Sequence, residues 1–205
     1  MLKILSVKFK WPSSVELHYN IEVSRGEIVT LEGPSGVGKS TLIDLISGFI
    51  QPLSGQIKWL DKDITYLHPS KRPIATIFQN DNLFDHLTCE FNASLGISPS
   101  GSLSQYNQQR LDKTFSELGI LDLKSRYPNQ ISGGQQARVS LARSLLSEKP
   151  IFLLDEPVSS LDQQTRTETL KVLKNTVKSH EITLVVVSHH DDDRKLLEAR
   201  PIEIK

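Results

Sequence analysis

Cysteine, methionine and long apolar runs are scarce in this chain of 205 residues, which has one cysteine and one methionine. The single cysteine, Cys89, cannot form a disulfide within the chain, and this fits a reducing compartment. The longest apolar stretches, residues 151–154 and 182–187, fall far short of the roughly 18 residues that cross a bilayer. Lysines interrupt the first residues before the apolar core of a signal peptide could form. If this chain acts at a membrane, we therefore expect a partner protein to hold it there.

A surplus of basic charge is also lacking. The 24 lysines and arginines are balanced by 24 aspartates and glutamates, so the formal net charge is zero. Proteins that bind nucleic acid usually carry a basic surplus, because their cations displace counterions from phosphates. The composition therefore argues against a nucleic-acid partner.

Branched apolar residues predict strands at both ends of the chain. The first part reads as strands at residues 3–7, 15–23, 28–31, 56–59 and 74–78. Between them, residues 40–49 have apolar side chains at helical spacing, namely Leu42, Leu45, Ile46 and Phe49. After Pro150 the pattern returns to strand, helix, strand and helix, ending in a short strand at 202–204.

The middle of the chain has a different character. Residues 80–149 are rich in helical patterns and polar loops, with helices predicted at 105–118 and 134–146. We therefore predict a single α/β domain over residues 1–205. Its core is formed by residues 1–79 and 150–205, and a helical lobe of residues 80–149 is inserted into it.

A glycine-rich loop follows the third predicted strand and precedes the first predicted helix. Its sequence fits the phosphate-loop pattern and comprises Gly33, Pro34, Ser35, Gly36, Val37, Gly38, Lys39, Ser40 and Thr41. Glycines let successive N–H groups point at one anion, and the helix start adds positive potential. Lys39 is expected to reach the β- and γ-phosphates, Ser40 to ligate Mg²⁺, and Thr41 to bond the α-phosphate. The alternative is a chance glycine turn, against which the flanking strand and helix argue.

Two carboxylates end the apolar run at residues 151–154. In phosphate-loop enzymes an aspartate at this place holds Mg²⁺, usually through water, so Asp155 is expected to take that role. Glu156 is placed to accept a proton from the attacking water as a general base. The alternative is a strand that ends in solvated acids, which the preceding phosphate loop makes the weaker interpretation.

A second candidate anion site lies at the start of the helix near residue 134. Ser132, Gly133 and Gly134 offer a hydroxyl and unobstructed N–H groups. Taken alone, the segment could equally be a helix capped by a serine. However, residues 131–135 resemble the Leu-Ser-Gly-Gly-Gln signature of the ATP-binding cassette (ABC) family, with Ile131 in place of leucine.

The resemblance extends over nearly the whole chain, because the family's other motifs follow in the family's order. It implies a P-loop NTPase (RecA-like) core with an N-terminal antiparallel β subdomain and an inserted α-helical subdomain. It also implies Mg²⁺-dependent ATP hydrolysis coupled to transport. The matching positions are Lys39, Gln79, Ser132, Asp155 with Glu156, residues 159–162 and His189.

Further roles come from the resemblance alone. Gln79 would contact Mg²⁺ and the attacking water, and His189 would touch the γ-phosphate. Trp11 would stack on adenine, with Phe9 as the alternative aromatic. In this family two copies pair head to tail. The segment Ser132, Gly133, Gly134 and Gln135 of one copy would close on the nucleotide of the other, and Asp162 would lie at the contact between the copies.

Three kinds of ABC protein fit these motifs: an importer ATPase, a soluble ATPase of DNA repair or translation, and a domain cut from an exporter. The chain shows neither fused membrane helices nor tandem cassettes, so the importer is favoured by family analogy. Residues 70–74 and 78–88 resemble the ATPases of thiamine importers. An importer ATPase would sit at the cytoplasmic face of the membrane, with permease subunits and a periplasmic or surface solute-binding protein as partners.

Two surface features complete the expectations. The segment 80–88, with Leu83, Phe84 and Leu87, is a candidate for docking the membrane subunit, and the alternative is an ordinary lobe surface. The acidic run 191–193 is expected to begin a helix, where its charges complement the helix dipole, in preference to binding a metal.

Overall fold

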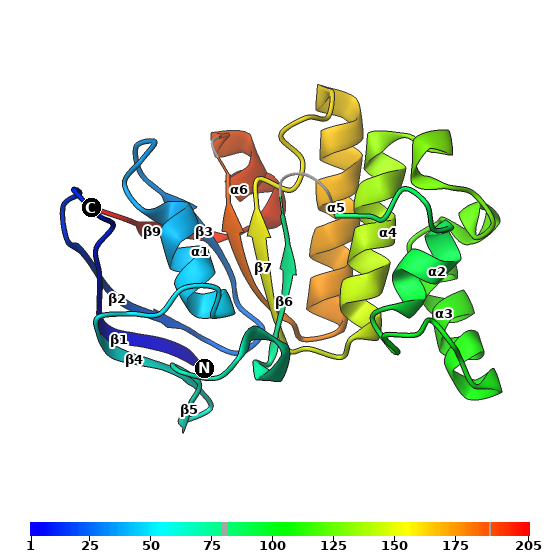
Figure 1. Ribbon diagram of the computed structural model, residues 1–205. Coiled ribbons are helices and arrows are strands. Elements are labelled where there is room, and N and C mark those ends of the chain that lie inside the picture. The colour runs from blue at the N-terminus through cyan, green and yellow to red at the C-terminus, as the bar shows by residue number, and fades with distance from the viewer. Residues whose placement is uncertain (79–81, 189) are drawn as a thin grey trace.

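The computed structural model describes residues 1–78, 82–188 and 190–205. Gln79 and His189, two residues that the sequence assigned to catalysis, lie outside the described residues. The described chain forms an antiparallel sheet, a parallel sheet and helices on both sides of the parallel sheet (Figure 1). No helix in this part of the chain is long and apolar enough to cross a bilayer.

The antiparallel sheet is four-stranded, in the order β2-β1-β4-β5. Its strands are β1 (Leu2–Phe9), β2 (Leu17–Val23), β4 (Ser54–Trp59) and β5 (Lys62–Asp63). Side chains alternate between its two faces, and those facing the helix α1 (Lys39–Ser47) are apolar and buried. The pairing of β1 with β2 sets Val7 opposite Tyr19, which carries Tyr19 toward the glycine-rich loop.

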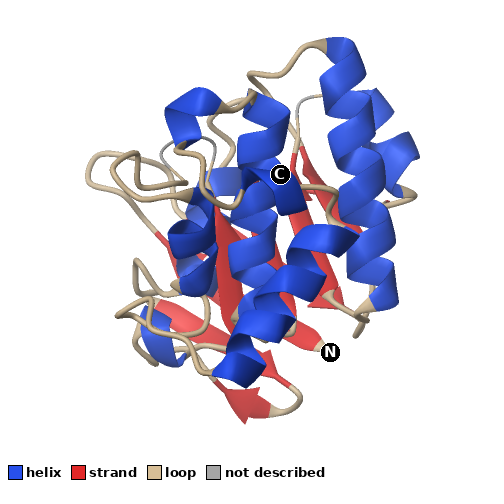
Figure 2. Cartoon of the chain, turned by 90° about the vertical axis from the view of Figure 1, so that its right-hand side faces the viewer, coloured by secondary structure: helices blue, strands red, loops and turns tan. Residues whose placement is uncertain are grey.

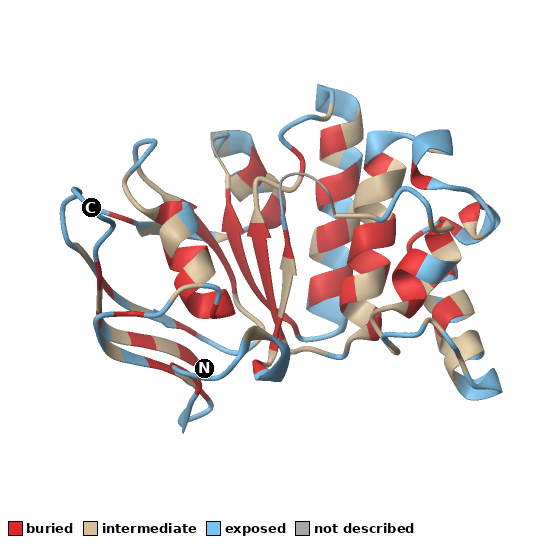
Figure 3. Ribbon diagram, in the orientation of Figure 1, coloured by how far each residue is buried: buried red, intermediate tan, exposed pale blue. Residues whose placement is uncertain are grey.

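The parallel sheet is five-stranded, in the order β6-β7-β8-β3-β9. Its strands are β3 (Ile28–Glu32), β6 (Ile74–Ile77), β7 (Ile151–Asp155), β8 (Thr183–Val187) and β9 (Arg200–Glu203). The central strands are buried on both faces, which explains why they read as unbroken apolar runs (Figure 3). Ile151 and Leu153 face α1, whereas Phe152 and Leu154 face the helices on the other side.

Helices cover the parallel sheet in layers (Figure 1). α1 lies between the two sheets, and α4 (Gly133–Leu146) and α5 (Gln163–Ser179) cover the opposite face of the parallel sheet. Seen from that side, helices lie in front of the strands (Figure 2). α2 (Cys89–Ser94) and α3 (Gln105–Glu117) pack outside α4, while α6 (Asp191–Leu197) follows β8 and packs against α5. Short 3₁₀ turns occupy Pro69–Lys71, Leu121–Leu123 and Pro128–Gln130. The loops that leave β3, β7 and β8 therefore emerge at the same edge of the sheet.

The main departures from the sequence prediction concern where elements end. The strand expected from residue 15 begins at Leu17, and Val15 is 82 % exposed in the irregular segment before it. The helix expected to reach Phe49 ends at Ser47, because Gly48 adopts a left-handed conformation (φ 85°). Phe49 is therefore 53 % exposed and contacts Phe78, instead of packing in the core.

Candidate nucleotide-binding site

The loop between β3 and α1 has the conformation that an anion cradle requires. Gly36 (φ 79°) and Gly38 (φ 106°) adopt left-handed conformations that other residues enter only with strain. The N–H groups of Lys39, Ser40 and Thr41, at the start of α1, have no acceptor among the described residues. These donors and the helix dipole leave positive potential at the loop.

Lys39 braces this loop from inside. Its side chain is buried, and its ammonium donates hydrogen bonds to the carbonyl oxygens of Gly33 (2.7 Å) and Pro34 (2.9 Å). The positive charge is thus held within the curl of the loop before any anion arrives.

A cavity of about 680 Å³ opens in front of the loop. It brings the loop together with the residue after β7 and with the segment before β2. Its lining comprises Trp11, Ser14, Val15, Leu17, Ser35, Gly36, Gly38, Lys39, Ser40, Thr41, Glu156 and Val187. Residues from both sheets therefore converge on one space.

The aromatic side chain in this cavity is Trp11. Phe9 is 9 % exposed and belongs to the core, whereas Trp11 is 44 % exposed and lines the cavity. The rings of Phe9 and Trp11 pack edge to face, with 5.0 Å between their centroids. This contact holds the indole in place. The indole Nε1 donates to the Thr41 hydroxyl at 3.2 Å, so that hydroxyl still has its own proton to donate. Of the two aromatics left open by the sequence, the geometry favours Trp11.

Glu156 has a strained backbone at the mouth of this cavity. Its φ of 48° lies in the left-handed region, and its N–H donates to the carbonyl of Val187 at 3.0 Å. The preceding residue, Asp155, ends β7, and its charge adds to burial in raising the pKa of Asp44 on α1. Asp155 therefore lies close to α1, and Glu156 lines the cavity in front of the loop.

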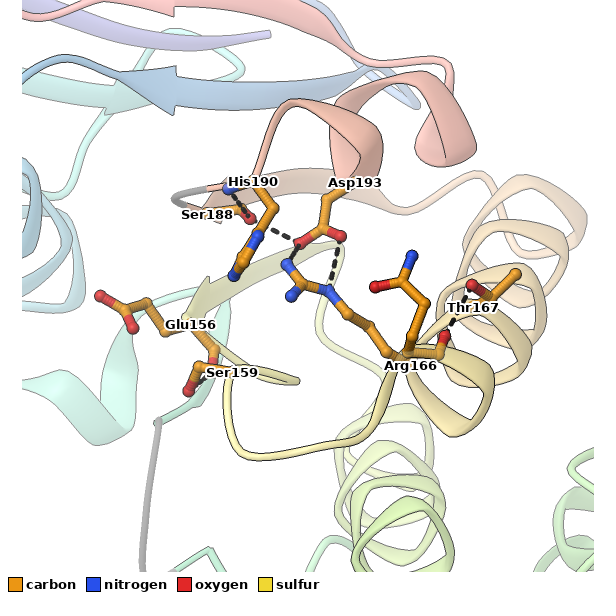
Figure 4. A network of polar contacts seen from close by, with 8 residues as sticks. Glu156, Ser159, Arg166, Thr167, Ser188, His190 and Asp193 are labelled. Atoms are coloured by element: carbon orange, nitrogen blue, oxygen red, sulfur yellow. Dashed lines mark hydrogen bonds and ion pairs between the residues drawn. The ribbon is translucent and has the colours of Figure 1, made fainter.

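A buried polar network lies behind Glu156, at the ends of β8 and α5 (Figure 4). The guanidinium of Arg166 donates to both carboxylate oxygens of Asp193, at 2.8 and 2.5 Å, and both side chains are almost fully buried. The Ser188 hydroxyl donates to the same carboxylate at 2.5 Å and accepts the N–H of His190 at 3.2 Å. The carboxylate of Glu156 points away from this pair (Figure 4). The network ties the start of α5 to the segment that leaves β8.

The signature segment forms the capped start of α4. The Ser132 hydroxyl accepts the N–H of Gln135 at 3.3 Å, and the Gln135 side chain accepts the N–H of Ser132 at 2.9 Å. A Cβ on Gly134 would lie 2.5 Å from Thr165, so glycine there permits close packing on α5. Asp162 caps α5 by accepting the N–H groups of Gln164 and Thr165. Hydrogen bonds from the side chain and the N–H of Thr165 hold the pKa of its carboxyl below the ordinary value.

Comparison with known proteins decides the family. The sequence profile described as "ABC transporter" matches residues 17–159, which is more than half of the chain. The chain belongs to the ABC transporter family. It is 40 % identical to the thiamine import ATP-binding protein ThiQ of Escherichia coli (strain UTI89) over 204 residues, which cover 100 % of this chain and 88 % of that protein.

Solved ABC structures are similar over the full length of the chain. One is cbiO1 from Clostridium perfringens, described as part of the ABC transporter complex cbiONQ, with a TM-score of 0.88, 28 % identity and coverage of 84 % of that chain. Another is the cassette MJ0796, a dimer in a post-hydrolysis state bound to ADP and phosphate, with a TM-score of 0.82, 29 % identity and 94 % coverage. The fold class and the ATP-binding, ATP-hydrolysing character expected from the sequence are confirmed.

Some of the ABC motifs line the cavity, whereas others lie outside it, at the starts of α4 and α5. Of the expected site residues, the cavity collects Trp11, Ser35, Gly36, Gly38, Lys39, Ser40, Thr41 and Glu156. Gly33 and Val37 shape the loop from its other side, where Val37 packs on the core. Ser132, Gly133, Gly134, Gln135 and Asp162 do not line this cavity, and Gln79 and His189 are not among the described residues.

The sequence prediction missed several residues that line the cavity or contact the glycine-rich loop. Ser14, Val15 and Leu17 line the cavity, and Tyr19 donates a hydrogen bond to the loop without lining the cavity. Alternating apolar residues marked this region only as a strand, so no local signal distinguished these positions. The Arg166–Asp193 pair was missed for the same reason, since Asp193 was assigned only to the start of a helix.

Proposed function

We propose that this chain is the ATPase subunit of an importer for thiamine or a related small solute. It would act as a peripheral subunit at the cytoplasmic face of the membrane, with permease subunits and a periplasmic or surface solute-binding protein. Support for the cargo comes from the relatives named thiamine import ATP-binding proteins, which match over the whole of this chain. The balanced charge of the chain speaks against a nucleic-acid partner.

The observation that carries the ATPase proposal is that the phosphate loop and Glu156 line the same cavity. Lys39 and the free N–H groups at the start of α1 would bind the phosphates of ATP, and Trp11 would stack on adenine. The Thr41 hydroxyl already accepts a hydrogen bond from Trp11, so it would donate a hydrogen bond to the α-phosphate. Glu156 would accept a proton from the attacking water as a general base. His189 would orient that water at the γ-phosphate.

The described residues also fit Mg²⁺. This ion prefers oxygen ligands and is usually held by one or two carboxylates together with substrate phosphates. Ser40 is exposed at the start of α1, and Asp44, one turn further along, has its pKa raised by burial and by the nearby charge of Asp155. Ser40 and Asp155, with Gln79, would therefore hold the ion. When bound, Mg²⁺ neutralises charge on the phosphate oxygens.

A second copy of the chain would complete the site. The capped start of α4, with Ser132, Gly133, Gly134 and Gln135, has exposed residues but lies outside the cavity of its own chain. In a head-to-tail dimer this segment would close on the nucleotide of the partner, and Asp162 would lie at the contact. The dimeric state of the cassette MJ0796 is consistent with this arrangement.

The division into lobes and the docking surface belong to the same proposal. The described part of residues 80–149 contains helices and no strand, which supports an inserted helical lobe between 1–79 and 150–205. Phe84 is 49 % exposed and Leu87 is half-buried outside the core cluster, whereas Leu83 packs partly on the core. We assign Phe84 and Leu87 to the contact with the membrane subunit.

The importer proposal is tested by reconstitution. The chain is co-purified with its permease subunits, placed in liposomes with ATP and Mg²⁺ on the ATPase side, and supplied with labelled thiamine and the binding protein outside. ATP-dependent accumulation of thiamine supports the proposal. Hydrolysis that no permease or solute stimulates, together with binding to ribosomes or DNA, would instead indicate a soluble ABC ATPase.

Replacing Lys39 with alanine tests the phosphate cradle. The change removes the ammonium that the loop carbonyls hold, so we expect ATP affinity to fall at least about thirtyfold, or about 2 kcal/mol, as for a charged hydrogen bond. Affinity is measured by calorimetric titration, and folding by circular dichroism. Lys62→Ala, in the exposed strand β5, is the matched control and should bind ATP normally. Normal affinity in Lys39→Ala would contradict the assignment of this loop.

A further inference from the structure

Tyr19 contacts the glycine-rich loop without lining the cavity. Its side chain is 3 % exposed, and its hydroxyl donates a hydrogen bond to the carbonyl oxygen of Gly38 at 2.8 Å. The same oxygen accepts the N–H of Leu42 at 2.9 Å, in the first turn of α1. A Cβ on Gly38 would lie 2.4 Å from the Tyr19 hydroxyl, so the phenol packs directly on this glycine.

The carbonyl of Gly38 and the N–H of Lys39 belong to one peptide group. That group is planar and trans, so its C=O and N–H bonds point in opposite directions. A bond that fixes the direction of the Gly38 carbonyl therefore also fixes the direction of the Lys39 N–H. This N–H is one of the donors at the start of α1 that have no acceptor among the described residues.

Gly38 makes such a restraint useful. It has no side chain, its φ is 106°, and no side chain caps α1 at this position. Glycine loses more conformational freedom on folding than any other residue, so this peptide has the most to gain from a fixed partner. Tyr19, from the antiparallel sheet, restrains the Gly38 peptide independently of the hydrogen bonds within α1.

The phenol is able to donate this bond under all physiological conditions. Burial raises the pKa of Tyr19 to about 12, so its proton stays in place. Leu17, from the same strand, also packs on Gly38.

We propose that Tyr19 is a positioning residue for nucleotide binding. By holding the Gly38 carbonyl it orients the Lys39 N–H toward the phosphates before ATP arrives, so that binding does not have to order this peptide. The inference rests on the proposed nucleotide site and adds a residue that touches no nucleotide atom. A purely structural tether between β2 and α1 is the alternative that the experiment must exclude.

The test compares Tyr19→Phe with the unchanged chain. The variant keeps the ring and loses only the hydroxyl, and we expect ATP and ADP to bind about five- to tenfold more weakly, the size of one hydrogen bond. In the nucleotide-free chain, the ¹H–¹⁵N resonance of Lys39 should shift or broaden, because its peptide is released. Tyr66→Phe removes an exposed hydroxyl (Tyr66 is 69 % exposed) and should change neither readout.

Two results would overturn the inference in different ways. If Tyr19→Phe binds ATP like the unchanged chain and its Lys39 resonance is unaltered, Tyr19 is only a tether, even if the stability of the fold declines. If the unchanged chain itself fails to bind Mg²⁺–ATP, the nucleotide site is wrong and the inference falls with it. Weaker binding accompanied by a changed Lys39 resonance supports it.

Discussion

Glu156→Gln is expected to bind ATP with nearly unchanged affinity and to lose hydrolysis by about 10² to 10⁴-fold. The substitution keeps the size of the side chain and removes only its capacity to take a proton, and a positioned general base contributes about this much to a rate. Because ATP is then bound without being hydrolysed, the dimer that ATP promotes should accumulate. Phosphate release gives the rate, and light scattering after gel filtration gives the mass of the complex.

A matched control separates the chemistry from the strained backbone. Glu181 also has a positive φ (52°) but precedes β8 at the opposite edge of the parallel sheet, where it pairs with Arg25. Glu181→Gln makes the same chemical change on the same kind of backbone and should hydrolyse ATP normally. Undiminished hydrolysis by Glu156→Gln would remove Glu156 as the base. A loss of ATP binding would show that this carboxylate acts in binding instead.

Asp193→Ala is expected to lower the free energy of unfolding by about 3–5 kcal/mol, because it leaves the buried guanidinium of Arg166 without its partner. This is a large part of the roughly 5–15 kcal/mol that stabilises a typical domain. The Ser188 hydroxyl loses its acceptor at the same time. Urea denaturation followed by circular dichroism measures the change.

The companion variants test whether burial is the cause. Replacing both Arg166 and Asp193 with leucine should recover much of the lost stability, since apolar groups of similar volume often replace a buried pair at little cost. Asp192→Ala removes the neighbouring acid, which is 70 % exposed and pairs with Lys195, and should change stability by less than about 1 kcal/mol. Equal effects for Asp192→Ala and Asp193→Ala would contradict the assignment of a desolvated pair.

The phosphate loop could be predicted closely because its determinants are adjacent in the chain. Glycines at fixed spacing, a lysine and a serine set the local backbone, and the flanking strand and helix follow from their own apolar periodicity. The buried strand before Asp155 and Glu156 was readable for the same reason. Chain position alone left the aromatic in the cavity open, because Phe9 and Trp11 are only two residues apart. The structure separates them, since Phe9 ends β1 and packs in the core, whereas Trp11 lies beyond the strand and lines the cavity.

The sequence by itself determined the class of the protein, the glycine-rich loop between β3 and α1 and the order of its motifs, since each of these depends on neighbouring residues. The tertiary structure alone decided which distant residues support them. The pairing of β1 with β2 brings Tyr19 to Gly38, and the packing of α5 on α6 brings Arg166 to Asp193. Such contacts arise from strand order and helix packing, which fix distances that no local pattern of residues encodes.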